Sequence, residues 1–250
     1  MKFGIIGGTS ESKEIAIFMY ENNIDFNIHF KNLYSSFNKN IIKSEIKKIE
    51  FLEGKIVVET IEKKYLYDFL IDMSHPFAQN IKKLYKDIPE NKVIKFCRKT
   101  SKYDKKFYDI DSIVLKIIEK KHKNILSLMG FKGTNIFIES VSKFNDINDF
   151  VIVSRSIEKV DFGINYFFKP EKIFDAEWFD YVIEKHAISC VLLKDSGEQS
   201  KLQEKLNFFS KKNIEIIILS YKDEVKKFKR FEEIFKLKEY ILEKVEINEK

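Results

Sequence analysis

The sequence predicts an α/β fold in which two units, each built on a parallel sheet, flank a ligand cleft. Apolar runs of strand length recur along all 250 residues, and segments with helical apolar spacing separate them. Strands joined through helices form parallel sheets with right-handed crossovers. The number of strands suits two sheets better than one very wide sheet, and the polar segment 99–111 interrupts the alternation. We therefore predict two Rossmann-like domains, an N-terminal dinucleotide-binding domain at 1–100 and a C-terminal substrate domain at 101–250.

In the first domain, strands are predicted where apolar residues run together, and helices where they recur every three or four positions. Ile15, Phe18 and Met19 show that helical spacing. Residues 47–61 fit either two strands around the Glu53-Gly54 turn or a strand followed by a short helix. The other predicted elements are strands at 2–6, 25–30, 67–74 and 91–99, with helices at 11–23 and 77–87.

The second domain continues the same alternation. Phe174, Trp178 and Val182 mark one amphipathic helix by their spacing of four residues. The predicted strands are 124–130, 150–157, 189–197 and 214–220, and the predicted helices are 111–123, 134–148, 174–187, 200–212 and 231–246.

The composition excludes one large class of partner. Arg98, Arg155 and Arg230 are the only arginines among 45 basic residues, and the lysines are interleaved with 39 acidic residues. Nucleic-acid-binding proteins more often concentrate basic residues in one arginine-rich stripe, so no nucleic-acid partner is expected. The net charge of +6 instead favours an anionic small ligand.

The sequence is typical of a cytoplasmic protein. No apolar run is long enough to span a bilayer, and the opening MKFGIIGG lacks the pattern of a signal peptide, so no membrane partner is expected. Cys97 and Cys190 lie in separate strand-like runs and are expected to be reduced, buried thiols. No pair of histidines has metal-ligand spacing, so no metal site is predicted, and we expect a monomer.

The segment IDMSHPFA, residues 71–78, places a His-Pro pair at the carboxyl end of a predicted strand. Ligands of open parallel sheets bind at this edge. Pro76 fixes its own φ and restricts His75 to an extended conformation, so the imidazole is held where a ligand would bind. Asp72 is either a general base beside His75 or a cap for the following turn.

The segment GIIGGTSES, residues 4–12, places Gly7 and Gly8 after the first strand, with Thr9 and Ser10 where the helix begins. Glycines let the backbone approach a phosphate, and the N–H groups of a helix N-terminus attract anions. A tight turn with a Ser/Thr cap is the alternative, since the full G-x-G-x-x-G pattern is not met. We favour phosphate binding because this is the first strand–helix turn of an α/β chain.

The end of the second predicted strand indicates the type of dinucleotide. An acidic residue here usually binds the ribose diol of NAD, whereas this chain has Lys31. A cation suits a 2′-phosphate, so we predict NADPH as the cofactor, with NADH as the other candidate.

A second loop motif, KDSG at 194–197, leaves another strand at its carboxyl end. Lys194 can pair with a carboxylate, and Ser196 with the Gly197 amide can bind an anion. An Asp/Ser helix cap is the alternative, and the motif alone favours it.

A short-chain dehydrogenase is excluded. Tyr181–Lys185 and Tyr240–Lys244 match its Tyr-x-x-x-Lys pattern, but a chain with 11 tyrosines and this many lysines produces such matches by chance. The upstream serine and the Asn-Asn-Ala-Gly signal are absent from the sequence.

Taken together, the loop segments resemble the precorrin-6A reductase family, which includes the cobalt-precorrin-6A reductases of cobalamin biosynthesis. The family opens with Gly-Gly-Thr-x-Glu, matched here at 7–11 with Glu11 as its acid. Its Asp-Ala-Thr/Ser-His-Pro-Phe/Tyr-Ala signature is matched at 72–78, with Met73 in place of alanine.

The resemblance extends over residues 3–220. An arginine after the next strand is matched by Arg98, and the late Lys-Asp/Glu-Ser-Gly before a lysine-bearing helix is matched at 194–197 with Lys205. The chain departs from the family at 167–174, which lacks Gly-Pro-Phe-Ser, and at 198–200, which replace a glycine pair.

The resemblance implies reduction of one macrocycle double bond by hydride from a nicotinamide, with a proton added at the neighbouring carbon. It places the pyrophosphate on Gly7, Gly8, Thr9 and Ser10, and the ribose phosphate near Lys31. The substrate is an anionic corrinoid ring, precorrin-6A or its cobalt form. Its acid arms are expected near His75, Arg98, Lys194, Ser196 and Lys205. His75 is also the leading candidate for the proton donor.

Two other functions fit the same fold. One is a non-catalytic dinucleotide sensor or scaffold that binds the cofactor without turnover. The other is an anion-binding domain that acts on sugars or phosphates. Loss of NADPH absorbance in the presence of the ring separates the enzyme from both.

Overall fold

The computed structural model describes residues 1–30, 40–99, 103, 106–156, 166–168, 174–196, 201–221 and 227–248. The chain forms two compact units, which we call unit 1 (Met1–Arg98 with Asp223–Lys250) and unit 2 (Lys99–Lys222). The prediction of one C-terminal domain over 101–250 is therefore wrong for its last segment. Leu237 and Ile241 of that segment are fully buried in the core of unit 1, where they pack with Phe3 and Ile15.

Unit 1 is built on a six-stranded sheet with the spatial order β15-β8-β7-β1-β2-β3. All its neighbouring strands are parallel, as the alternation of strands and helices predicts. The sequence missed β3 and β15, which are three residues long and too short to show a period. The strands are β1 (Lys2–Ile6), β2 (Asp25–Phe30), β3 (Ile41–Lys43), β7 (Phe69–Asp72), β8 (Val93–Phe96) and β15 (Lys229–Phe231).

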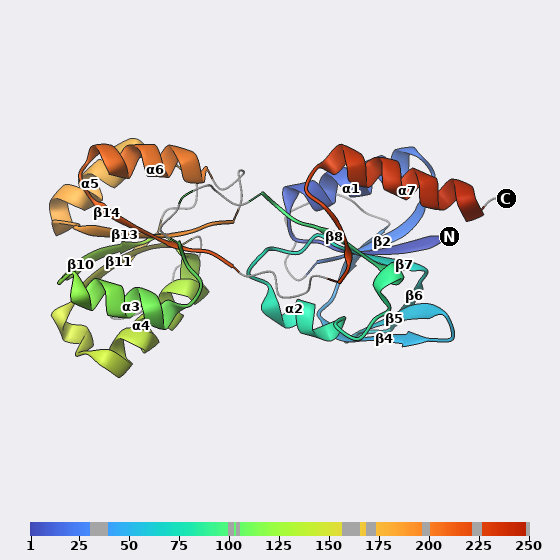
Figure 1. Cartoon of the computed structure of the whole chain (residues 1–250), viewed down its shortest axis with the longest axis horizontal. Coiled ribbons are helices and arrows are strands. Elements are labelled where there is room, and N and C mark those ends of the chain that lie inside the picture. The colour runs from blue at the N-terminus through green and yellow to red at the C-terminus, as the bar shows by residue number, and fades with distance from the viewer. Residues whose placement is uncertain are drawn as a thin grey trace. The chain divides into compact units, whose positions relative to one another are not determined.

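Helices cover both faces of this sheet. Helices α1 (Ser10–Glu21) and α7 (Ile234–Asn248) lie together on one face, and α2 (Gln79–Leu84) lies on the other (Figure 1). Ile15 and Met19 of α1 are fully buried, in agreement with their helical spacing. Helix α2 is shorter than the predicted helix at 77–87, because a turn in which Ala78 N–H donates to the His75 carbonyl comes first.

The ambiguous segment around Glu53-Gly54 forms two antiparallel strands, and a third strand follows. These strands are β4 (Ile46–Leu52), β5 (Lys55–Thr60) and β6 (Lys64–Tyr67). Glu53 and Gly54 have φ of 49° and 79°, which suits a tight two-residue hairpin turn. The predicted strand at 67–74 is wrong at its start, because Tyr67 pairs with Ile56 in this second sheet.

Unit 2 repeats the parallel architecture with the strand order β12-β11-β10-β13-β14-β9. Its neighbouring strands are all parallel. The short edge strands β9 and β12 were not predicted, and β9 lies inside the polar segment taken as a boundary. The strands are β9 (Lys106–Phe107), β10 (Asn124–Ser127), β11 (Val151–Ser156), β12 (Tyr166–Phe168), β13 (Cys190–Lys194) and β14 (Glu215–Leu219).

Four helices enclose the sheet of unit 2. Helices α5 (Ala176–His186) and α6 (Leu202–Lys211) lie on one face, and α3 (Ile110–Glu119) and α4 (Gly130–Phe144) lie on the other (Figure 1). Helix α4 starts earlier than the predicted 134, because Gly130 turns the chain with a φ of 72°. Two short 3₁₀ turns complete the described elements, at Glu90–Lys92 and Ile147–Asp149. None of the described helices is long and apolar enough to cross a membrane.

Each parallel sheet has one point at which its strand order reverses. From β1 the chain proceeds to β2 and β3 on one side, and β7, β8 and β15 follow on the other. In unit 2 the reversal falls between β10 and β13. Ligands of open α/β sheets bind beyond the carboxyl ends of the strands at such points. The loops after β1 and β7, and those after β10 and β13, are therefore the expected binding regions of the two units.

Candidate functional site

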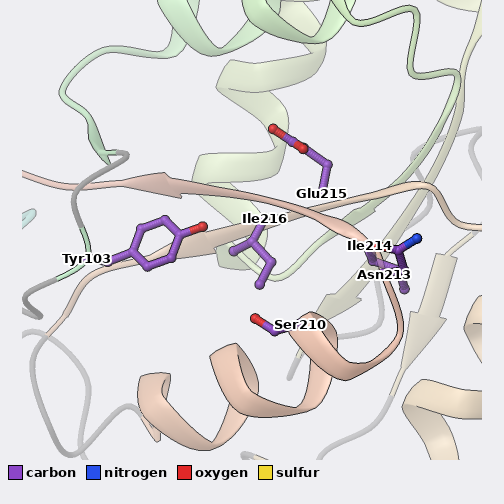
Figure 2. A pocket seen from close by; sticks show the side chains of 6 residues that line it. All are labelled: Tyr103, Ser210, Asn213, Ile214, Glu215 and Ile216. Atoms are coloured by element: carbon purple, nitrogen blue, oxygen red, sulfur yellow. The ribbon is translucent and has the colours of Figure 1, made fainter.

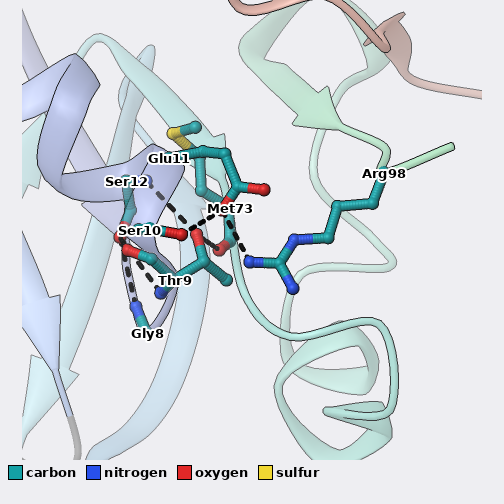
Figure 3. A network of polar contacts seen from close by, with 7 residues as sticks. All are labelled: Gly8, Thr9, Ser10, Glu11, Ser12, Met73 and Arg98. Carbon is teal, nitrogen blue, oxygen red and sulfur yellow. Dashed lines mark hydrogen bonds and ion pairs between the residues drawn. The ribbon is translucent and has the colours of Figure 1, made fainter. Parts of the chain in front are cut away.

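The two predicted loops of unit 1 emerge side by side at its reversal point. Ile6 at the end of β1 is in register with Asp72 at the end of β7, so Gly7 and Met73 leave adjacent strands. The Thr9 hydroxyl donates a 3.1 Å hydrogen bond to the Met73 carbonyl and ties the loops together (Figure 3). The structure thus brings the glycine loop and the His-Pro loop into contact.

The glycine loop is shaped by close packing and by a helix cap. A Cβ at Gly7 would lie 2.6 Å from the Phe30 ring, so only glycine fits there, and Gly8 has a φ of 126° that favours glycine. Thr9 is the N-cap of α1 and accepts a hydrogen bond from Ser12 N–H. The Ser12 hydroxyl accepts from Gly8 N–H and Thr9 N–H, each at 3.3 Å.

The cap that the sequence offered as an alternative is therefore present. Its two bonds to the Ser12 hydroxyl lie at the long end of the normal range, where hydrogen bonds are weak. Sequence reasoning did not assign Ser12 to a capping box, because the usual signal is a Ser or Thr followed three residues later by Glu or Gln.

The first turn of α1 also carries a charged pair. Arg98 donates a 2.6 Å hydrogen bond to Glu11, and the two side chains are 13% and 11% exposed. Figure 3 shows Arg98 extending from the end of β8 toward this turn. Burial, the largest single cause, raises the pKa of Glu11, but the hydrogen bonds to this carboxylate and the charge of Arg98 together outweigh it, so the net pKa is lowered. The structure places Arg98 against the glycine loop.

The His-Pro loop is fixed at its base by Asp72. This buried carboxylate accepts hydrogen bonds from the Tyr85 hydroxyl and, at 2.9 Å, from Ser74 N–H. Of the two predicted roles for Asp72, the structure favours that of a cap for the turn.

His75 is half-buried at the carboxyl edge, where the sequence predicts it. Its Nδ1 accepts a 3.3 Å hydrogen bond from Phe77 N–H, so the neutral ring carries its proton on Nε2. The buried Lys82 donates a 2.6 Å hydrogen bond to the carbonyl of the next residue, Pro76. The sequence did not mark Lys82 as a functional residue, because it is one of many lysines and most lysines are exposed to solvent.

In unit 2, Lys194 ends β13 and lies across the first turn of α4. Its Nζ is 2.8 Å from the position of a Cβ at Gly133, so glycine makes room for the lysine. Burial and then the charge of Lys132 lower the pKa of Lys194. Ser196 N–H donates to the Lys194 carbonyl at 3.2 Å.

Asp195 of the same loop is completely buried and pairs with Lys106 of β9 at 2.9 Å. Lys106, which is 12% exposed, therefore fixes the loop that carries Lys194 and Ser196. Lys106 was missed because the pairing joins residues that are far apart in the sequence.

Lys205 of α6 is half-buried near a second cation, Arg155 of β11. Burial and then the charge of Arg155 lower the pKa of Lys205 to about 8. The Arg155 guanidinium lies 5.9 Å from the centre of the Trp178 ring. Sequence reasoning did not single out Arg155, although its position near the end of a strand is a usable signal.

Buried hydroxyl groups join the first turn of α4 to two strands of unit 2. The Thr134 hydroxyl lies 2.8 Å from that of Ser127 and 3.1 Å from that of Ser154. These hydroxyl contacts stabilise the first turn of α4, across which Lys194 lies.

The structure thus separates the predicted residues into two sets. Unit 1 brings together the glycine loop, His75 and Arg98, and unit 2 carries Lys194, Ser196 and Lys205. Lys31 and Gly197 lie outside the described residues, as do 198–200 and most of 167–174. In the described part of the chain, no three His, Cys, Asp or Glu side chains gather as metal ligands would.

A small open pocket of about 250 Å³ lies elsewhere in unit 2 (Figure 2). It adjoins the amino end of β14, away from the carboxyl edge of that sheet, and contains none of the predicted site residues. Its lining is Tyr103, Ser210, Asn213, Ile214, Glu215 and Ile216.

Comparison with known proteins agrees with this architecture. The family model described as Precorrin-6x reductase CbiJ/CobK matches residues 3–239. The cobalt-precorrin-6A reductase of Methanocaldococcus jannaschii is 25% identical over 221 residues, covering 82% of this chain and 84% of that protein. A solved CobK precorrin-6A reductase has a TM-score of 0.71 at 12% identity, over 97% of this chain and 96% of that one, which shows the shared fold. Since the family model spans nearly the whole sequence, the chain belongs to the precorrin-6x reductase family.

Proposed function

We propose that this protein reduces a macrocycle double bond of precorrin-6A, or of its cobalt form, with NAD(P)H during cobalamin biosynthesis. The observation that carries the proposal is the contact between the glycine loop and the His-Pro loop, joined through Thr9 and Met73 at the reversal point of unit 1. This is where an α/β sheet binds a dinucleotide, and it occurs here in a member of the reductase family.

The glycine loop fits a dinucleotide pyrophosphate. Among the described residues, no atom lies within 4 Å of a Cβ built at Gly8, so the backbone there is open to a phosphate. Gly7, Gly8, Thr9 and Ser10 would hold the pyrophosphate, with the positive end of α1 behind them. The nicotinamide supplies hydride when it is bound. Lys31 would bind the 2′-phosphate of NADPH, the cofactor that we propose ahead of NADH.

His75 is the proposed group of unit 1 that acts on the ring. Its Nε2–H can donate a hydrogen bond to an acid arm of the substrate. In the imidazolium form, the same atom can supply the proton that accompanies hydride transfer. Protonation at Nδ1 would break its hydrogen bond from Phe77 N–H, so the two roles have different pH dependence.

The cations of unit 2 would bind further carboxylates of the macrocycle. Lys194 and Ser196 stand on the loop that Lys106 and Asp195 hold in place, and Lys205 stands near Arg155. Arg98 donates a hydrogen bond to Glu11, so we propose that it supports the glycine loop, and its remaining N–H donors can also bind an acid arm of the ring. We also propose that the protein acts as a monomer in the cytoplasm, which size-exclusion chromatography with light scattering tests for the oligomeric state.

The direct test is consumption of NADPH with precorrin-6A and, in parallel, with its cobalt form. We expect loss of NADPH absorbance with one or both rings. We also expect a strong fall in turnover for His75→Ala with little change in cofactor affinity. If the protein binds NADPH and neither ring consumes it, the enzyme proposal fails and the sensor or scaffold takes its place.

A further inference from the structure

We propose that Lys82 is a positioning residue that acts with Tyr85 to hold the His-Pro loop, and through that loop sets the orientation of His75. The inference rests on the proposed function only where it concerns turnover. Its structural core, the effect of Lys82 on the His75 ring, stands apart from any reaction.

The first observation is the burial of Lys82. The residue is 6% exposed, and its ammonium donates a 2.6 Å hydrogen bond to the Pro76 carbonyl. Lysine is almost never buried to this extent without partners, because removing an ammonium group from water is costly. The contact with Pro76 therefore offsets a real desolvation cost, and the lysine does more than occupy space.

The second observation is the geometry of α2. Lys82 lies in α2, and Tyr85, three residues later, is the C-cap residue of this helix. Lys82 donates to the Pro76 carbonyl and Tyr85 donates to the Asp72 carboxylate. Helix α2 and its C-cap residue thus hold both ends of the segment that contains His75.

The third observation is the hydrogen bonding inside the loop. His75 Nδ1 accepts from Phe77 N–H at 3.3 Å, and the His75 carbonyl accepts from Ala78 N–H at 2.8 Å. The Pro76 carbonyl belongs to the same peptide group as Phe77 N–H. When Lys82 fixes that carbonyl, it also fixes the N–H that selects the His75 tautomer.

The test compares Lys82→Met with Lys83→Met, a matched control that removes an exposed lysine from the same helix. The first measurement is the tautomer of His75 from long-range ¹H–¹⁵N spectra of the imidazole nitrogens, assigned with His75→Gln. We expect the wild type and Lys83→Met to hold the neutral ring with its proton on Nε2. We expect Lys82→Met to show a mixture of tautomers. An unchanged tautomer in folded Lys82→Met overturns the inference, whether or not the protein reduces a ring.

The second measurement separates kcat from affinity. We expect Lys82→Met to lower kcat by about 10- to 100-fold, the effect of misplacing a group at the reaction centre, while the Kd of NADPH changes less than about twofold. Lys82→Arg keeps a cation within reach of Pro76 and should recover most of the loss. An equal loss in Lys82→Arg and Lys82→Met, with circular dichroism unchanged, contradicts a positioning role.

A third variant covers the case in which Lys82→Met does not fold. Lys82→Gln keeps a polar group on α2 but is too short to reach the Pro76 carbonyl, so we expect the same mixture of tautomers. A folded Lys82→Gln with the wild-type tautomer and kcat overturns the proposal.

Discussion

Replacing Arg98 with methionine tests which of two roles this residue has. The resemblance to known reductases suggested that Arg98 binds an acid arm of the ring. In the structure it donates a 2.6 Å hydrogen bond to Glu11, in the first turn of the helix that follows the glycine loop. Arg98→Met would leave the Glu11 carboxylate, which is 11% exposed, without its cation.

The size of the effect follows from this burial. Breaking a fully buried ion pair by removing one partner costs about 3–5 kcal/mol, and both side chains here keep some exposure. We therefore expect Arg98→Met to lower the free energy of unfolding by about 2–4 kcal/mol. Glu11→Gln keeps an acceptor for Arg98 and should cost about 1–2 kcal/mol. The double variant should be less destabilised than the sum of the two, with a coupling of at least about 1 kcal/mol.

The assay is urea unfolding of the wild type, the two single variants and the double variant, followed by far-ultraviolet circular dichroism. Their free energies of unfolding can be compared directly when the four m-values agree. Cofactor binding gives the second readout. An unpaired carboxylate beside the glycine loop repels a phosphate, so we expect Arg98→Met to raise the Kd of NADPH by about tenfold. The double variant Arg98→Met/Glu11→Gln should recover much of the affinity for NADPH, because it lacks the unpaired carboxylate.

Coupling below about 0.3 kcal/mol, together with an unchanged Kd for NADPH and a raised KM for the ring, would contradict a role of Arg98 in holding the glycine loop. Arg98 would then be a substrate ligand, and its contact with Glu11 would be incidental.

Three further predictions concern other ionisable groups. Burial lowers the pKa of His29 to about 4, so the unfolded chain binds the proton first as the pH falls below 6.5, and stability is lost from there downward. Urea unfolding should show the wild type losing about 2 kcal/mol more than His29→Phe between pH 7.5 and 5, and equal losses would contradict this burial. Lys106→Met should lower the free energy of unfolding by about 3–5 kcal/mol, because Asp195 is completely buried; a loss below about 1 kcal/mol in the same assay would show that the pair is not needed. Lys205, with a pKa of about 8, loses its charge as the pH rises from 7 to 9, so the KM of the ring should rise over this range in the wild type and stay flat in Lys205→Arg; parallel profiles would remove Lys205 from the substrate site.

The position of the two loops in unit 1 could be predicted because their signals are local. Glycines after the first strand and a His-Pro pair after a later strand mark the carboxyl ends of strands without any knowledge of the pairing. The register of β1 with β7 then places Gly7 beside Met73. The capping box was only partly readable, since Thr9 and Ser12 have its spacing but Ser12 stands in place of the usual Glu or Gln.

The side chains that hold these loops could not be predicted, because they reach them through long-range packing. Lys106 lies on a two-residue edge strand in a segment whose composition suggests a linker, yet it pairs with the buried Asp195. Lys82 is one of many lysines, and only the fold shows that it is buried. The return of α7 to unit 1 was missed for the same reason, because the helical spacing of Leu237 and Ile241 predicts their burial but not the sheet that they pack against.

Following the hydride itself shows whether it passes from the nicotinamide to the macrocycle. The protein would be incubated without oxygen with precorrin-6A or its cobalt form and with NADPH deuterated at the hydride-bearing carbon of the nicotinamide, and the ring would then be analysed by mass spectrometry. We predict a reduced ring that carries a single deuterium at a carbon position, and a strongly diminished yield with His75→Ala. An unreduced ring in the presence of bound NADPH, or a reduced ring without deuterium, would contradict direct transfer from the nicotinamide to the macrocycle.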